Sequence, residues 1–276
     1  MTASKMRLAA VDIDSTLLVD GGISDENREA IQSLTAAGVQ VVLSTGRSFH
    51  HTLPCYHRLN LNTPIVTTDG ALVMDCAAGA VLSETFLPRD ISSFIMHAAA
   101  DSGITCLNFV REGIATTSRF DWATSLERHA QEMGRRFRSC TAQKLCRRSV
   151  FKAHVYCREQ ARLQTLVDLI TCRFADRVEP VFCGRHGCEL VVKGVSKLSA
   201  LETLAARLGI RPQQVIAFGD GLNDIGMLSW AGMSFCMFHG TEAAKQAAHR
   251  VAPATEPRVN LAAAIADPAT KKWLNN

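Results

Sequence analysis

The sequence contains no hydrophobic run long enough to cross a membrane, since a spanning helix needs about 20 predominantly apolar residues. Its first ten residues also lack the apolar stretch that forms the centre of a secretory signal peptide. Internal repeats and low-complexity linkers are missing as well. These absences argue against a membrane protein, a secreted protein and a repeat array. We therefore expect a globular cytoplasmic protein with no membrane partner.

No Cys-x-x-Cys motif occurs, although the chain has ten cysteines. A disulfide framework is typical of short secreted chains, and a chain of 276 residues without a visible signal is neither. Reduced thiols, many of them buried as small apolar residues, are the better expectation. Two cysteine pairs lie close together in the sequence, and each could have a histidine as a further zinc ligand. Their spacings match no common structural zinc site. The pairs are Cys140/Cys146 with His154 and Cys183/Cys188 with His186.

Neither charge nor aromatic content is high. The net charge is +4 and aromatic residues make up 6% of the chain, while apolar residues make up 47%, enough for a sizeable core. The densest basic group is expected to be a solvated helix face with its neighbouring loop, so we expect no nucleic-acid partner. Nothing in the sequence indicates the oligomeric state. The basic group comprises Arg135, Arg136, Arg138, Lys144, Arg147 and Arg148.

The first third of the chain alternates predicted strands with predicted helices. Short apolar runs predict buried strands, and a serine before an apolar stripe of period 3.6 predicts a capped helix that ends at a glycine. This alternation is typical of a parallel sheet with right-handed crossovers. The strands are expected at Arg7–Val11, Val39–Leu43 and Pro64–Thr67, and the helix between Ser24 and Gly38, with Ala30, Ile31, Leu34 and Ala37 on one stripe.

The pattern becomes less regular after Pro88 and resumes at Gly194. The intervening residues mix helical and β-rich stretches, as in an antiparallel α+β unit. The length suits one α/β core with a smaller inserted domain. We therefore predict a core domain at 1–87 and 189–276, interrupted by an insert at 88–188. The insert's helices are expected at 91–100 and 158–174 and its strands at 104–110, 151–157 and 178–183, and after it a helix at 197–209 and strands at 215–218 and 234–238.

Polar clusters follow three of the predicted core strands. Ligands bind just outside the carboxyl ends of the strands in an open parallel sheet, so the clusters are candidates for one site. Each cluster alone is compatible with a turn or a helix cap. Together they bring four carboxylates to one edge, which requires a cation or protonation, and an all-oxygen site suits Mg²⁺. The clusters are Asp12-Ile13-Asp14-Ser15-Thr16, Ser44-Thr45-Gly46-Arg47 and Gly219-Asp220-Gly221-Leu222-Asn223-Asp224.

Lys197 stands at an unfavourable position for a cation. Ser196 predicts the N-cap of the following helix, so the lysine falls in the first turn, where the helix dipole disfavours positive charge. A single lysine of this kind is common on a protein surface. A phosphate and an aspartate facing it would explain the placement.

Four motifs, taken in their order along the chain, resemble those of the haloacid dehalogenase (HAD) superfamily. The long insert resembles the cap of its Cof-type (class IIB) phosphatases. The resemblance covers essentially the whole chain. It implies an α/β fold with a Rossmann-like parallel-sheet core and an inserted α+β cap of C2B type over the active edge. It also implies a phosphoric monoester hydrolase. The motifs are Asp12-x-Asp14-x-Thr16, Thr45-Gly46-Arg47, Gly194-Val-Ser-Lys197 and Gly219-Asp-Gly-x-Asn-Asp-x-x-Met-Leu228.

The resemblance implies a role for each motif residue. Asp12 would attack phosphorus and form an aspartyl-phosphate, and Asp14 would protonate the leaving oxygen and then deprotonate water. Thr45 and Lys197 would stabilise the transferring phosphoryl group. Mg²⁺ would be held by the carboxylates of Asp12 and Asp220 and the main-chain carbonyl of Asp14, with Asp224 holding Lys197 or a metal-bound water. Ile13, Gly46 and Asn223 complete the expected phosphate-binding set.

The chain departs from the usual family pattern at several positions. Ser15 replaces the commoner Gly, Leu198 replaces the Gly after the lysine, and Asp69 stands where Asn is usual. The segment 256–259 replaces an acidic-Gly-Val turn. These differences bear on the substrate more than on the chemistry.

The expected substrate is a small phosphorylated metabolite: a sugar phosphate, a nucleotide or a cofactor phosphate. Two alternatives stay open: a phosphomutase or phosphotransferase, which would keep its aspartyl-phosphate from water, and a non-catalytic protein that binds phosphorylated ligands. Specificity is expected in the insert, although each candidate there is more simply explained as a surface or structural residue. These candidates are Arg111, Arg119, His154, Arg185 and His186.

Overall fold

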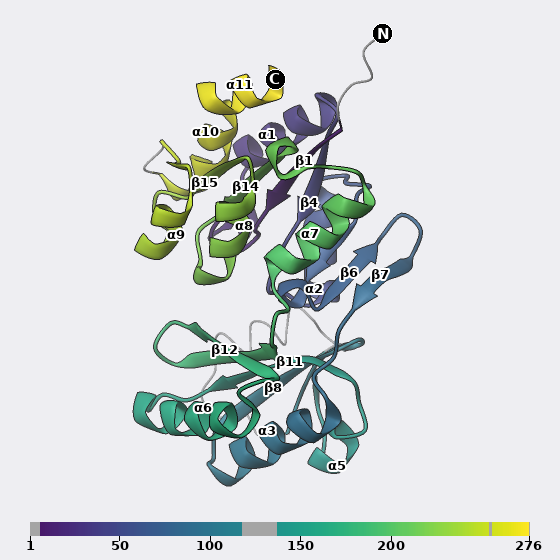
Figure 1. Cartoon of the computed structure of the whole chain (residues 1–276), viewed down its shortest axis with the longest axis vertical. Helices are drawn as coiled ribbons and strands as arrows, with labels where there is room; N and C mark the ends of the chain where they lie inside the picture. Colours follow the sequence, from purple (N-terminus) through teal and green to yellow (C-terminus); the bar gives the residue numbers. More distant parts are fainter. Residues whose placement is uncertain (1–5, 118–136, 254–255, 276) are drawn as a thin grey trace. The chain divides into compact units, whose positions relative to one another are not determined.

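The computed structural model describes residues 6–117, 137–253 and 256–275. The chain divides into two compact units, coloured along the sequence in Figure 1. The core unit comprises Met1–Gly46, Pro54–Leu82 and Ser196–Asn276. The inserted unit comprises Arg47–Leu53 and Ser83–Val195.

A parallel sheet of five strands forms the centre of the core unit, in the order β16-β15-β14-β1-β4. β1 lies between β14 and β4 and pairs in parallel with both, so all three strands end at the same edge. The predicted Rossmann-like parallel core is thereby confirmed. The strands are β1 (Arg7–Val11), β4 (Val39–Leu43), β14 (Val215–Gly219), β15 (Met233–Cys236) and β16 (Arg250–Val251).

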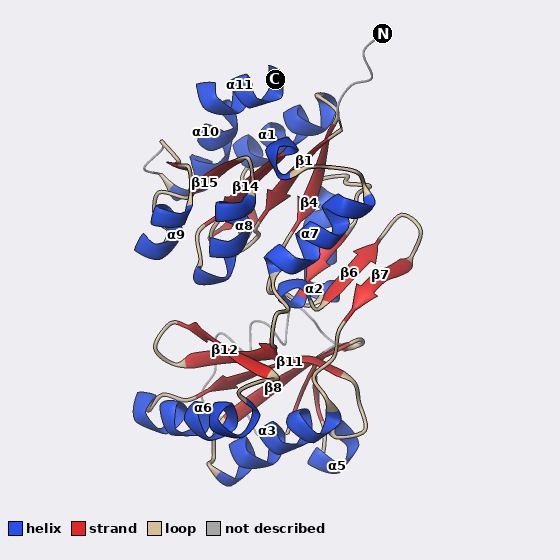
Figure 2. Ribbon diagram, in the orientation of Figure 1, coloured by secondary structure: helices blue, strands red, loops and turns tan. Residues whose placement is uncertain are grey.

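Helices cover both faces of this sheet (Figure 2). On one face, helices α7 and α8 contribute Leu201, Leu204 and Met227 to an apolar cluster that includes Leu8 and Val215 of the strands. Close packing of this kind holds the strands and helices in fixed positions. The helices are α1 (Asp25–Ala36), α2 (Phe49–Arg58), which runs through both units, α7 (Lys197–Arg207), α8 (Ile225–Trp230), α9 (Glu242–Ala247), α10 (Asn260–Ala266) and α11 (Pro268–Asn275).

Shorter elements complete the core unit. A hairpin of β2 and β3 follows β1, and β5, β6 and β7 form a small sheet that a parallel bridge between Ser44 and Val66 joins to the end of β4. The 3-10 turn η1 (Thr68–Gly70) lies between β5 and β6. The strands are β2 (Leu18–Val19), β3 (Gly22–Ile23), β5 (Ile65–Thr67), β6 (Leu72–Asp75) and β7 (Ala80–Glu84), and the other 3-10 turns are η3 (Pro212–Gln214), η4 (Leu222–Asp224) and η5 (Pro257–Val259).

The inserted unit is an α+β layer. Its sheet has the order β10-β9-β8-β11-β13-β12 and is antiparallel except between β9 and β10. Helices α3 and α6 pack on one face of it, around a cluster of buried apolar side chains. The elements are α3 (Arg89–Asp101), β8 (Thr105–Val110), β9 (Gly113–Thr116), β10 (Phe137–Ser139), α5 (Ala142–Leu145), β11 (Val150–Tyr156), α6 (Gln160–Phe174), β12 (Val178–Cys183) and β13 (Gly187–Val192).

The predicted strands and helices are confirmed within a few residues, with local differences. Helix α1 begins after Ser24, whose hydroxyl accepts a hydrogen bond from the Asn27 amide at 3.1 Å. Its buried stripe includes Asn27 in place of the expected Ala37, which is exposed where the helix ends. The last predicted strand ends at Cys236, and Phe238 is exposed.

The expected boundary after residue 188 falls inside β13. That strand pairs with both β11 and β12, so the inserted unit continues to Val195. The basic group also differs from the expected helix face. Arg138 belongs to β10 and Lys144 to α5, whereas Arg135 and Arg136 lie outside the described residues.

Three further observations concern the described residues. None of their helices has both the length and the apolar character needed to cross a membrane. None of the ten cysteines, all of which lie in this part of the chain, forms a disulfide bond, and five of them are buried. Neither cysteine pair considered for zinc belongs to a group of potential metal ligands in this part of the chain.

Candidate active site

The polar clusters that follow β1, β4 and β14 meet at one edge of the core sheet. Asp12 comes directly after β1, and its amide donates to the carbonyl of Phe218 in β14 at 3.0 Å. Thr45 follows β4 and donates its amide to Val66 at 3.0 Å. Asp220 comes directly after β14. The topology therefore brings together side chains that lie up to about two hundred residues apart in the sequence.

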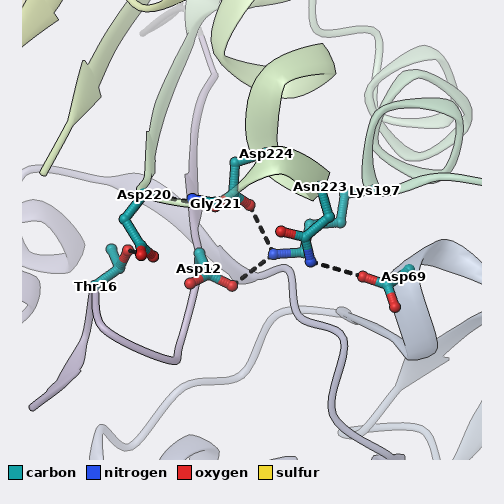
Figure 3. A network of polar contacts seen from close by, with 8 residues as sticks. All are labelled: Asp12, Thr16, Asp69, Lys197, Asp220, Gly221, Asn223 and Asp224. Carbon is teal, nitrogen blue, oxygen red and sulfur yellow. Dashed lines mark hydrogen bonds and ion pairs between the residues drawn. The ribbon is translucent and has the colours of Figure 1, made fainter. Parts of the chain in front are cut away.

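A buried lysine joins two of the carboxylates, as Figure 3 shows. Lys197 Nζ lies 2.6 Å from Asp12 Oδ1 and 2.7 Å from Asp224 Oδ1. The lysine and Asp224 side chains are each 1% exposed and that of Asp12 is 7% exposed. A lysine so far from water is stable as a cation only because two carboxylates face it.

The N-terminus of α7 holds Lys197 at this position. Ser196 caps the helix: its hydroxyl accepts from the Ser199 amide at 3.1 Å, and the Ser199 hydroxyl accepts from the Ser196 amide at 2.9 Å. This reciprocal capping box fixes the first turn despite the unfavourable dipole. The predicted N-cap is thereby confirmed.

The loop after β14 folds around the Asp224 side chain. Asp224 Oδ2 accepts hydrogen bonds from the amides of Asp220 and Gly221, both at 2.9 Å. The side chain occupies the space beside Gly219, where an added Cβ would lie 2.6 Å from the Asp224 carboxyl carbon. Glycine at 219 is therefore required for the loop to close on Asp224.

The carboxylates of Asp12, Asp220 and Asp224 form a group in which the nearest oxygens all lie within 4.8 Å of one another. Thr16 donates its hydroxyl to Asp220 Oδ1 at 3.1 Å. Hard oxygen donors grouped in this way suit Mg²⁺, which keeps part of its water shell. The Asp14 carboxylate does not belong to this group, and its side chain is exposed.

Burial and mutual repulsion shift the acidity of these groups. Burial raises the pKa of Asp12 well above its usual range; Lys197 opposes this shift, while Asp224 and Asp220 add to it. Burial, with the charge of Asp224, raises the pKa of Asp220 to about 6. Burial alone would lower the pKa of Lys197, but Asp12 and Asp224 outweigh it and raise that pKa. The cluster has more negative charge than one lysine balances, as a cation site requires.

Asp69 is a site residue whose partner the sequence did not predict. It is buried, with φ 55° and ψ 36°, and its Oδ1 accepts a hydrogen bond from Asn223 Nδ2 at 2.9 Å. Its charge also raises the pKa of Lys197, by less than the charges of Asp12 and Asp224 do. The only signal in the sequence was that Asp stands where Asn is usual.

The turn that carries Asp69 packs against the start of α7. A Cβ on Gly70 would lie 2.1 Å from the carbonyl oxygen of Ser196, and Gly70 has a φ of +93°. Only glycine fits this approach. Asp69, Gly70 and the residue before Lys197 therefore form one packed support for the site.

Two other departures from the family pattern have local explanations. Ser15 has a φ of 59°, a conformation that glycine adopts without cost and serine at some cost. Its carbonyl oxygen lies 2.6 Å from His239 Nε2. At 256–259, the carbonyl of Arg258 accepts from the Ser24 hydroxyl at 2.7 Å, so the altered turn joins the N-cap of α1.

The remaining predicted residues have varied surroundings. The Ile13 side chain is fully buried, so only its main chain is available to a ligand, and Gly46 follows the buried Thr45.

The specificity candidates in the insert have surroundings of several kinds. Arg111 pairs with Glu84, His154 Nδ1 lies 3.9 Å from Glu189, and His186 contacts the Tyr156 ring. Arg185 is exposed, and Arg119 lies outside the described residues.

The α/β core with an inserted α+β unit and a carboxylate–lysine cluster at its strand ends is matched by a hydrolase family and by relatives that are named phosphatases, so the chain is a phosphoric monoester hydrolase. The chain belongs to the haloacid dehalogenase-like hydrolase family, whose pattern matches residues 9–258. The resemblance inferred from the motifs is thereby confirmed.

Named relatives and a solved structure agree with this assignment. The chain is 29% identical over 232 residues to the HMP-PP phosphatase of Serratia proteamaculans (strain 568), covering 84% of this chain and 83% of that protein. It is 27% identical over 274 residues to the 5-amino-6-(5-phospho-D-ribitylamino)uracil phosphatase of Bacillus subtilis (strain 168), covering 92% and 94%. A haloacid dehalogenase-like hydrolase from Bacteroides thetaiotaomicron has the same fold, with a TM-score of 0.85 at 24% identity over 95% of this chain and 99% of that chain.

Proposed function

We propose that this chain is a Mg²⁺-dependent phosphatase that hydrolyses a small phosphorylated metabolite through an aspartyl-phosphate on Asp12. The observation that carries the proposal is the position of Asp12: at the end of the central strand, 2.6 Å from a buried lysine and within a group of three carboxylates. A buried carboxylate fixed in this way is a nucleophile whose orientation is set before substrate arrives.

In the first half of the proposed reaction, an Asp12 carboxylate oxygen attacks phosphorus and the bond from phosphorus to the leaving oxygen breaks. Asp14 donates a proton to that oxygen, which departs as an alcohol. The exposed side chain of Asp14 suits a group that must meet both leaving group and water. Lys197 balances charge on the transferring phosphoryl oxygens, and Thr45 donates a hydrogen bond to them.

In the second half, Asp14 removes a proton from a water molecule, the water oxygen attacks phosphorus, and the bond to Asp12 breaks. Inorganic phosphate leaves and both aspartates return to their starting states. Ile13, Gly46 and Asn223 would complete the contacts to the phosphate. The inserted unit, with its main segment Ser83–Val195, is proposed as the cap that carries substrate specificity.

Asp12, Asp220 and the main-chain carbonyl of Asp14 would hold the metal. Both oxygens of Asp224 already accept hydrogen bonds from protein groups, so we assign Asp224 to holding Lys197 and not to direct contact with the metal. Bound Mg²⁺ would supply positive charge that allows one anion to attack another. Oxygen donors and an excess of carboxylates support this metal over softer ones.

The proposed substrate class follows from the relatives. The two named phosphatases act on phosphorylated small molecules, one of them a ribitylaminouracil phosphate. We propose the same broad class here: sugar phosphates, nucleotides and cofactor phosphates.

The test is phosphate release from p-nitrophenyl phosphate and a panel of metabolite phosphates, with Mg²⁺ or EDTA. We expect release that requires Mg²⁺ and disappears in Asp12→Asn, and a loss of at least about 10²-fold in Asp14→Asn. Circular dichroism checks that both variants fold. Appreciable turnover by Asp12→Asn would contradict its role as nucleophile.

Two other outcomes would favour different functions. A stable phosphoprotein without phosphate release would indicate a phosphotransferase or mutase, and the next assay would include a sugar bisphosphate. Mg²⁺-dependent binding without turnover would indicate a ligand-binding protein.

A further inference from the structure

A second cavity lies at the opposite end of the core sheet from Asp12. Its volume is about 920 Å³, and it is lined by residues at the beginnings of β1 and β15, by residues just before β14, and by α11. Figure 1 shows α11 at the end of the core unit where β1 begins. Because Asp12 and Asp220 follow the other ends of β1 and β14, this cavity is distinct from the candidate active site.

The lining of this cavity is strongly cationic. Arg7, Arg211, Arg250 and Lys272 all line it, against a single carboxylate, Asp267. That carboxylate lies 3.5 Å from Arg250. Four cations against one anion leave a formal excess of three positive charges around one hollow. A concave cationic surface concentrates small anions.

Three of these cations have no carboxylate partner among the described residues. The Arg7 guanidinium lies 5.7 Å from the centre of the Trp273 ring, and Arg211 Nε donates to the Gln214 side chain at 3.3 Å. Lys272 is exposed and forms no ion pair within the described chain. Isolated surface cations need no partner, but three that converge on one cavity can bind one anion together.

One wall of the cavity is largely apolar. Trp273 is buried, its indole nitrogen donating to the carbonyl of Gln213 at 3.1 Å, and Met233 and Pro268 add apolar surface beside it. Pockets for small organic ligands commonly have volumes of about 300–1,000 Å³ and combine apolar walls with a few charged groups. A free inorganic anion would use only the charged part.

We propose that this cavity is a second binding site, for a phosphorylated small organic molecule of about mononucleotide size. The arginines and Lys272 bind the phosphate groups, and the wall beside Trp273 contacts the organic part. The site does not depend on the proposed phosphatase mechanism, because none of its residues belongs to the carboxylate cluster.

The experiment is isothermal titration calorimetry of the full chain with ADP in EDTA at low ionic strength, with pyrophosphate as the comparison. Without a divalent cation, the carboxylates around Asp12 repel anions, so binding reports the cavity. We expect saturable one-to-one binding of ADP that is tighter than binding of pyrophosphate. Phosphate release is not measured, so the result is separate from the test of the phosphatase.

A matched pair of variants locates the binding. Lys272→Glu and Lys271→Glu make the same charge change on adjacent exposed residues of α11, but only Lys272 lines the cavity. We expect Lys272→Glu to weaken ADP binding by about tenfold or more and Lys271→Glu by less than about twofold, the difference amounting to roughly 1 kcal/mol. Arg211→Gln, with an expected loss of about fivefold, provides a second variant if Lys272→Glu does not fold.

Equal weakening by the two lysine variants would overturn the proposal, because it would show non-specific attraction to the surface. The absence of saturable ADP binding would overturn it as well. If pyrophosphate binds as tightly as ADP, the organic part of the ligand contributes nothing to affinity, and the proposal of an organic ligand is wrong.

Discussion

Each of the two units has a lysine buried from solvent, and their surroundings differ in charge. In the inserted unit, Lys152 Nζ lies 2.5 Å from Glu189 Oε1 and 4.6 Å from the centre of the Phe109 ring. In the core unit, Lys197 faces Asp12 and Asp224. The Lys152 side chain is 0% exposed and the Lys197 side chain 1%. The degree of burial therefore does not distinguish the two lysines.

The difference lies in the balance of charge. Lys152 and Glu189 form one ion pair, and a buried pair of this kind needs nothing from outside the protein. Around Lys197, the carboxylates of Asp12, Asp224, Asp220 and Asp69 leave a formal excess of three negative charges. An excess that the protein itself does not neutralise indicates a ligand, here a cation. Uncompensated buried charge, more than buried charge as such, therefore marks a functional site.

Of the two buried lysines, Lys197 should have the greater effect on activity when it is replaced by methionine. Removing the cation should lower kcat by about 10²- to 10³-fold, the range found when one charge-stabilising donor is lost. It should also lower the melting temperature more in EDTA than in Mg²⁺, because the metal relieves part of the carboxylate repulsion. Steady-state phosphate release and thermal melting with each additive measure both effects. If Mg²⁺ changed the melting temperature of neither the parent chain nor Lys197→Met, the cluster would bind no cation.

Lys152→Met is the matching change in the other unit, and it should act on stability instead. It removes the cation that lies 2.5 Å from the buried Glu189 carboxylate, so we expect a loss of about 3 kcal/mol in the free energy of unfolding, measured by urea denaturation. The loss should be independent of Mg²⁺, and kcat for p-nitrophenyl phosphate should be close to that of the parent chain.

A double variant sharpens this result. Lys152→Met with Glu189→Leu replaces the ion pair by apolar side chains and should recover most of the lost stability. If Lys152→Met lowered kcat as much as Lys197→Met does, Lys152 would belong to the catalytic machinery, and the distinction between the two lysines would be wrong.

Most of the core could be predicted because its signals are local. The apolar runs of β1 and β14 end at Asp12 and Asp220, and a parallel sheet brings such ends together whatever the chain between them does. The serine before Lys197 predicted the helix cap, and the lysine's unfavourable place in the first turn was compatible both with an acidic group facing it and with an ordinary surface lysine. These features depend on short stretches of sequence.

What could not be predicted depends on pairings between distant segments. The hydrogen bond between Asp69 and Asn223 joins residues 154 positions apart. β13 has the buried Glu189 in an otherwise apolar strand, which breaks the pattern unless its partner Lys152 is known. The expected boundary fell inside that strand for the same reason. Such contacts follow from three-dimensional packing and leave no periodic signal.

The smallest change in activity is expected from Asp69→Asn, which tests the charge excess while an acceptor for the Asn223 hydrogen bond is kept. An asparagine oxygen can still accept the hydrogen bond from Asn223, so the fold should be unchanged. Loss of one negative charge near Lys197 should lower KM for an anionic substrate by roughly two- to fivefold, corresponding to about 0.5–1 kcal/mol, with little change in kcat. The effect should shrink as ionic strength rises. Steady-state kinetics at low and high salt measure it, with Asp69→Leu as the variant that also removes the hydrogen bond. If Asp69→Asn and Asp69→Leu behave alike, the contact is unimportant; if Asp69→Asn raises KM, the carboxylate itself contributes to substrate binding.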